Sequence, residues 1–171
     1  MEKKQTHLVY GMVTAVIMVI INLVIYLAGW AFIDGVPYVT EIPLLVGLIL
    51  NAMAYSKAND GYVTFGNVFS SCFKATMIVT VIMVVWCIVT IYAMPEMKEK
   101  VLEVTRQKML KNPQVTDDIM EMSMNFTRKY WNAIAIASAI IGTLFFGTIF
   151  SLIAGGIAKK NGEMPFPEDN V

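Results

Sequence analysis

The chain alternates between long apolar stretches and short polar connections. The apolar stretches cover residues 8–33, 37–56, 68–94 and 131–158. The first, third and fourth exceed the roughly 20 residues that a helix needs to cross the hydrocarbon of a bilayer. Together they contain one charged residue, Lys74. The pattern predicts an all-α, polytopic membrane protein with four transmembrane helices, forming a single membrane domain over residues 1–171.

The stretch at 37–56 carries the weakest signal, because its strongly apolar part is short and is preceded by Glu41 and Pro43. Proline is well tolerated in the first turn of a helix, where its missing N–H is not needed. A carboxylate there is favoured by the positive end of the helix dipole. We therefore expect a span that begins near the membrane interface. If it did not cross, the topology of everything after it would invert.

The long polar connection, residues 95–130, carries two helical patterns separated by Pro113. On each side, apolar positions recur at intervals of three and four, as on one face of a helix. Thr116 or Asp117 is a suitable cap for the second helix. We expect the third and fourth spans to continue out of the bilayer as an antiparallel helical hairpin, with Pro95 kinking or restarting the third helix at the membrane exit. Its predicted core consists of Met97, Val101, Val104, Ile119, Met122 and Phe126.

Lysine and arginine residues near the span ends predict the orientation of the chain. Lys3 and Lys4 precede the first span, whereas the connection 34–41 contains neither residue type. We therefore expect both termini in the cytoplasm, in a multi-pass protein of the cell (inner) membrane, with a disordered tail over 161–171. The basic-rich segment 95–130 would then lie outside, against the rule. The side of the membrane that bears the hairpin stays open.

Small residues recur every four positions along the last span, forming a ridge on one side of that helix. Lipid supplies no hydrophobic drive for helices to associate, so close backbone approach must supply the attraction. Such a ridge favours packing against another span of the same chain, and a homodimer face is the alternative. Its members are Ala135, Ala139, Thr143, Gly147, Ser151 and Gly155.

Strongly polar residues are few inside the apolar stretches. Asn22 lies near the centre of the first, Asn51 lies in the second, and Lys74 lies near the start of the third. Cross-helix hydrogen bonding is the simplest role for the two amides. The alternative is that these polar residues line a path for a substrate or an ion.

Composition agrees with a membrane protein and limits the chemistry. Of 171 residues, 57% are hydrophobic and 15% are charged, and the 13 basic and 13 acidic side chains balance. No net field therefore attracts nucleic acid. His7 is the one histidine, which excludes a His-based metal cluster. The sequence contains no phosphate-binding glycine loop, zinc motif or nucleophile elbow. We expect no cofactor, no metal and no enzymatic activity.

Several short motifs, in order along the chain, resemble a known family. They are Tyr10-Gly11, Phe65-Gly66-x-x-Phe69, Tyr92-x-x-Pro95, and Ser151-Leu152-Ile153 running toward Lys159-Lys160. Over about residues 7–160 the chain resembles the uncharacterised bacterial membrane proteins grouped as domain of unknown function 4199. The resemblance implies a four-span cell-membrane protein with a long third connection. It implies no activity and no catalytic residue.

Two classes of function remain open at this point. The projecting hairpin and the absence of reaction chemistry favour a non-enzymatic scaffold or accessory subunit. It would bind a membrane-protein partner or a second copy through the hairpin or the ridge. The alternative is a small oligomeric transporter or channel, in which Asn22, Asn51 and Lys74 would have to share one polar path.

Overall fold

The computed structural model describes residues 5–33 and 35–158 of the chain, and within these ranges every regular element is a helix. The all-α prediction is therefore confirmed. The predicted disordered tail, 161–171, lies outside the described residues. The helices are α1 (Thr6–Leu27), α2 (Val36–Val39), α3 (Glu41–Ala58), α4 (Phe65–Ala93), α5 (Glu96–Leu110), α6 (Asp117–Lys129) and α7 (Trp131–Ile157).

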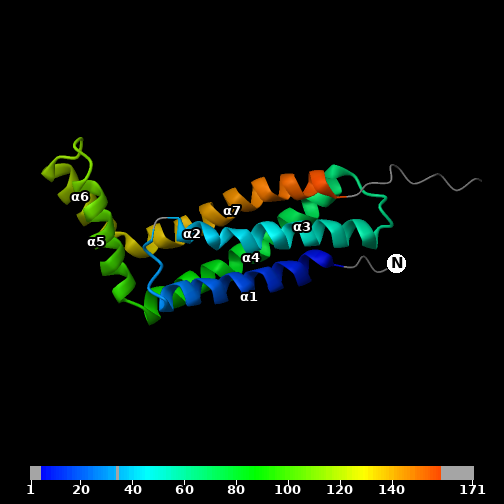
Figure 1. Ribbon diagram of the computed structural model, residues 1–171, viewed down its shortest axis with the longest axis horizontal. Coiled ribbons are helices and arrows are strands. Elements are labelled where there is room, and N and C mark those ends of the chain that lie inside the picture. Colours follow the sequence, from blue (N-terminus) through cyan, green and yellow to red (C-terminus); the bar gives the residue numbers. More distant parts are fainter. Residues whose placement is uncertain (1–4, 34, 159–171) are drawn as a thin grey trace, which may run out of the picture.

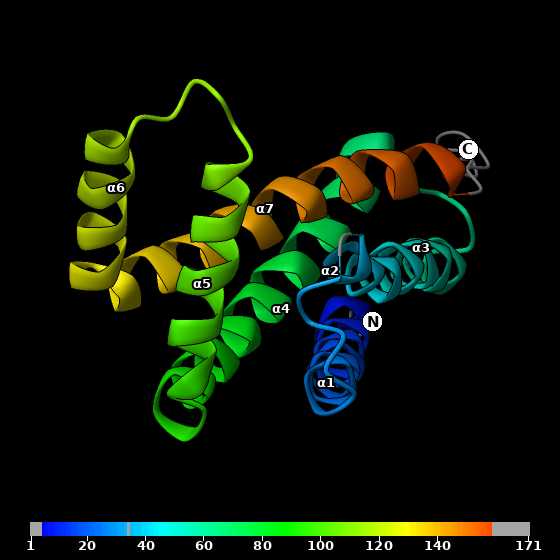
Figure 2. The ribbon, with the colours of Figure 1, turned by 60° about the vertical axis from the view of Figure 1, so that its left-hand side comes forward.

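Helices α1, α3, α4 and α7 lie side by side in a bundle, and α5 and α6 lie across one end of it (Figures 1 and 2). α1 begins and α7 ends at the opposite end, which we call the terminal end (Figure 1). α4 packs against each of the other three helices of the bundle. Three helices, α1, α4 and α7, are long and apolar enough to cross a membrane. α3 is not among them, since Glu41, Asn51 and Lys57 make it more polar.

Small residues let the helices of the bundle approach closely. A Cβ built on Gly147 of α7 would lie 2.1 Å from Cγ2 of Thr76 in α4, and one on Gly47 of α3 would lie 1.9 Å from Oγ1 of Thr14 in α1. These distances are far inside van der Waals contact. The two glycines therefore set how near α7 comes to α4, and α3 to α1.

The predicted restart of the third helix at Pro95 is confirmed, but the helix that follows does not extend the line of α4. α4 ends at Ala93 and α5 begins at Glu96, with Pro95 as its N-cap residue. The chain changes direction there, so α5 runs across the bundle axis (Figure 1). Proline lacks the N–H and carries the ring that would disrupt a continuous helix, which explains the break. α6 and α7 are likewise separate helices, divided at Tyr130.

The predicted hairpin core is wrong for its second arm. Ile119, Met122 and Phe126 of α6 are exposed by 45%, 69% and 58%. Arg128 of α6 forms an ion pair with Glu99 of α5 at 3.2 Å, and the half-buried Met120 and Met124 lie on the same side of α6. Instead of meeting the apolar positions of α6, the α5 stripe turns toward the bundle. There Met97 and Val101, with the first turns of α7, line a shared cleft at the start of α7. Val104 is half-buried.

We predict that Gly147→Ala destabilises the bundle, whereas Gly142→Ala in the same helix does not. A Cβ at Gly142 meets nothing within 4 Å, and alanine is favoured over glycine in a helix by up to about 1 kcal/mol. At Gly147 the added methyl overpacks against Thr76, which typically costs about 1–3 kcal/mol. Unfolding in mixed detergent micelles measures the difference.

A second-site change makes this test specific. Thr76→Ala removes the atoms that the new methyl would strike, so it should restore part of the loss in the Gly147→Ala background. Equal destabilisation by the two glycine variants, or no recovery in the double variant, would contradict the close-approach argument.

Candidate functional site

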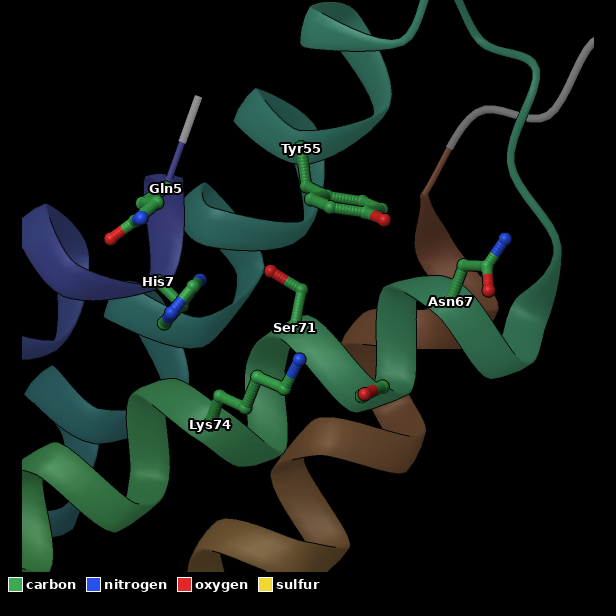
Figure 3. A pocket seen from close by; sticks show the side chains of 7 residues that line it. Gln5, His7, Tyr55, Asn67, Ser71 and Lys74 are labelled. Atoms are coloured by element: carbon green, nitrogen blue, oxygen red, sulfur yellow. The ribbon is translucent and has the colours of Figure 1, made fainter. Parts of the chain in front are cut away.

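A polar cleft opens at the terminal end of the bundle between α1, α3 and α4. Its volume is about 450 Å³. Figure 3 shows His7, Tyr55, Ser71 and Lys74, from the three helices, around one space. The residues that line the cleft are Gln5, His7, Tyr55, Asn67, Ser70, Ser71 and Lys74. The cleft therefore brings Lys74 together with several other polar side chains near this end.

Asn51 lies fully buried and bonds to the helix that forms the wall of this cleft. Its Nδ2 donates to Ser71 Oγ at 3.2 Å and to Cys72 Sγ at 3.5 Å. The Cys72 thiol in turn donates to the carbonyl of Leu48 at 3.4 Å. Because the thiol proton is used there, the sulfur accepts from Asn51, which fixes the orientation of the amide. Asn51 thus acts as a polar tie between α3 and α4.

Asn22 is not brought together with Asn51. Its Nδ2 donates to the carbonyl of Met18 in its own helix at 2.9 Å. It lines a different cleft of about 310 Å³ near the α5–α6 end, together with Thr40 and Thr90. The predicted polar residues are therefore divided between the two ends of the bundle.

The small-residue ridge of α7 faces α4 within the same chain. Thr143, Gly147, Ser151 and Gly155 are buried, and Ala135 and Ala139 are half-buried. Gly155 lies against the ring of Phe65, at the start of α4. Most of the ridge is therefore unavailable to a second copy, and packing within the chain accounts for it.

An exposed apolar strip runs along α6 at the other end of the molecule, and we call it the α6 face. It consists of Ile119, Met122, Phe126 and Tyr130, all exposed. The rings of Phe126 and Tyr130 contact each other in a tilted arrangement, with their centroids 4.9 Å apart. Thr116 caps this helix by accepting a hydrogen bond from the backbone N–H of Ile119. Sequence periodicity had identified the strip but assigned it to the wrong neighbour.

A hydrogen bond ties α5 to the end of α1. The Tyr26 hydroxyl donates to the Glu96 carboxylate. This hydrogen bond is the main cause of a lowered pKa for the Glu96 carboxyl. A hydrogen bond from the residue's own backbone N–H and the nearby charge of Lys100 also lower the pKa, whereas burial raises it without reversing the net direction. This contact could not be predicted from the sequence, because the two residues are far apart along the chain.

Among the described residues, no group of three or more His, Cys, Asp or Glu side chains could hold a metal ion. The arrangement offers a cleft at the terminal end, two clefts near the α5–α6 end, the buried Asn51 amide that links α3 to α4, and an exposed face of α6. It therefore defines a class: an all-α protein with apolar helices suited to a membrane and with polar groups gathered at the bundle ends.

Comparison with known families places the chain more narrowly. Residues 9–160 match the family described as protein of unknown function (DUF4199), and the chain belongs to that family. This confirms the resemblance found in the sequence motifs. A search of curated proteins and a search of solved structures each find no match.

We predict that the α5 contact weakens in acid. The pKa of Glu96 is lower in the folded protein than in the unfolded chain, so its contribution is present above the unfolded pKa of about 4.3 and is lost as the pH falls through the folded value. Hydrogen exchange of the α5 amides at pH 7 and pH 3 measures this, and exchange rates must be corrected for their intrinsic pH dependence.

Tyr26→Phe is the matched variant, because it removes only the donor. It should make α5 less protected at pH 7 and should abolish most of the difference between the two pH values. An unchanged pH dependence in Tyr26→Phe would show that other carboxylates govern the docking of α5.

Proposed function

We propose that this protein is a four-span, non-enzymatic membrane scaffold that assembles with a second copy of itself through the α6 face. The observation that carries the proposal is the unpartnered strip of Ile119, Met122, Phe126 and Tyr130. Large apolar side chains exposed together on an amphipathic helix are typical of an interaction surface. The α7 ridge, which was the other candidate surface, packs inside the chain.

Support for a fourth span comes from the packing of α3. It contacts α1, α4 and α7, and its 18 residues extend about 27 Å, close to the roughly 30 Å of hydrocarbon. Glu41 and Lys57 stand in its first and last turns. With four spans, both termini share one side, and Lys3, Lys4 and Lys57 favour the cytoplasm and a cell inner-membrane location.

Charge complementarity favours a second copy as the occupant of the α6 face. α6 carries Asp117 and Asp118 in its first turn and Arg128 and Lys129 in its last. Two such helices packed antiparallel would bury both apolar strips. The same arrangement would bring the acidic turn of each copy near the basic turn of the other. A two-fold axis produces this self-complementary contact without any further surface.

The direction of α6 makes that symmetry compatible with a membrane. α6 runs across the bundle axis (Figures 1 and 2), hence nearly in the membrane plane if the bundle spans the bilayer. A two-fold axis along the membrane normal then relates two antiparallel α6 helices while both bundles keep the same orientation. A helix parallel to the bundle would have required one copy to be inverted.

We predict a cysteine cross-link between Met122→Cys on one chain and Phe126→Cys on a differently tagged chain, oxidised in native membranes. An antiparallel register centred on the strip brings these two positions together. The pair Glu121→Cys and Asn125→Cys, on the polar side of the same helix, is the matched control and should remain uncross-linked. Cys72 and Cys87, the two native cysteines, are replaced by serine throughout.

Charge reversal tests the antiparallel direction. Asp118→Lys and Lys129→Glu should each reduce the Met122–Phe126 cross-link, and the two together should restore it. Equal cross-linking of both cysteine pairs, or cross-linking only to another protein, would refute a specific dimer through α6.

A transporter or channel is the second candidate, and two of the clefts favour it. One opens at the terminal end near Lys74 and the other at the α5–α6 end near Asn22. Along α4, Thr76 lies between Lys74 of the first cleft and Met83 of the second, and its hydroxyl bonds to its own helix. The buried hydroxyl of Ser151 has no hydrogen-bond partner among the described residues. Flux of ions or small solutes in proteoliposomes that disappears in Asn51→Leu would favour this candidate over the scaffold.

A further inference from the structure

We infer that the cleft at the terminal end is a binding site for a phosphate-type anion, either the headgroup of an acidic phospholipid or a free phosphate. The ligand is inferred from the side chains that line the cleft, where Ser71 and Lys74 lie near each other (Figure 3), and from the depth of the cleft along the bundle. This inference is independent of assembly through α6, which lies at the opposite end of the molecule (Figure 1).

The polar side chains that line the cleft are rich in hydrogen-bond donors. Lys74 contributes an ammonium group, Asn67 an amide and Ser70 a hydroxyl. None of the seven residues that line the cleft in the described part of the chain is acidic. A cavity with a positive charge, several donors and no carboxylate is complementary to an anion rather than to a cation.

Asn51 orients the Ser71 hydroxyl through a buried hydrogen bond. Because its Nδ2 donates to Ser71 Oγ, the serine oxygen already acts as an acceptor and its proton is free to point elsewhere. Figure 3 shows the Ser71 oxygen directed into the space between His7 and Tyr55. The buried amide therefore turns the hydroxyl into a donor toward the cleft.

The position of Lys74 matches the level of lipid phosphates. It lies nine residues after Phe65, about 13 Å along α4 at the usual helical rise, and α4 is 29 residues long. A helix of that length exceeds the roughly 30 Å hydrocarbon layer, so Lys74 stands only a turn or so inside it. A lysine at that depth extends its ammonium group back to the headgroups.

Basic pockets between transmembrane helices on one face of a membrane recognise anionic headgroups through the same combination of charge and donors. Lys57 at the end of α3 lies near the same end of the bundle but does not line the cleft. Comparing variants of the two lysines therefore distinguishes binding in the cleft, which needs Lys74, from attraction by surface charge, to which Lys57 would contribute equally.

The experiment uses the full-length protein, purified in a neutral detergent and exchanged into mixtures of phosphatidylcholine and phosphatidylglycerol. Native mass spectrometry then counts the lipids retained. Wild type should retain phosphatidylglycerol over phosphatidylcholine by about fivefold, the effect of one lysine near a headgroup. Lys74→Gln should lose this preference, and Lys57→Gln, the matched control, should keep it.

A second arm separates the two sources of the anion. Inorganic phosphate is titrated calorimetrically into delipidated protein. Heat that depends on Lys74, without a lipid preference, assigns the cleft to a soluble phosphate compound. A phosphatidylglycerol preference without binding of inorganic phosphate assigns it to lipid.

Two further variants keep the test decisive if Lys74→Gln does not fold. Lys74→Arg retains the charge and should retain binding, whereas Ser71→Ala removes one donor and should weaken it. Absence of both lipid preference and phosphate binding in wild type would overturn the inference. Equal losses in the Lys74 and Lys57 variants would overturn it as well, because they would reveal a surface charge effect only.

Discussion

Close approach between small residues is the constraint on which the rest of the structure depends. In lipid, apolar side chains gain nothing by leaving the solvent, so helices associate through contact between backbones and through hydrogen bonds. Gly147 lets α7 reach Thr76, and Gly47 lets α3 reach Thr14. Asn51 adds a polar tie between α3 and α4. Once these contacts are made, the relative positions of the four helices are set.

Those contacts also decide which surfaces remain for function. Most of the α7 ridge is buried inside the bundle, so it cannot serve as the main contact for a second copy. The amphipathic helix α6 keeps its apolar strip exposed, while Arg128 on another side of it pairs with Glu99 of α5 and the start of α5 lines a cleft with the bundle. Polar groups are held at the two ends, where side chains such as Lys74 line clefts rather than lipid-facing surface.

The sequence predicted the candidate residues better than it predicted their neighbours. The spacing of Ile119, Met122 and Phe126 correctly indicated a helix with an apolar side, and Thr116 was correctly identified as a possible cap. It could not reveal that this side faces away from α5. Nor could it reveal that Lys74 shares a cleft with His7, since that requires knowing how α1 and α4 cross.

Hydropathy and local stereochemistry by themselves determined that the chain is helical, that its long apolar stretches suit lipid, and that Pro95 interrupts the chain at the end of α4. These follow from short-range properties: residue polarity, helical periodicity and the missing N–H of proline. Only the tertiary structure decided the partner of each face, the clefts and the Tyr26–Glu96 contact. Such features depend on how helices rotate and cross, and periodicity defines a face without defining what that face meets.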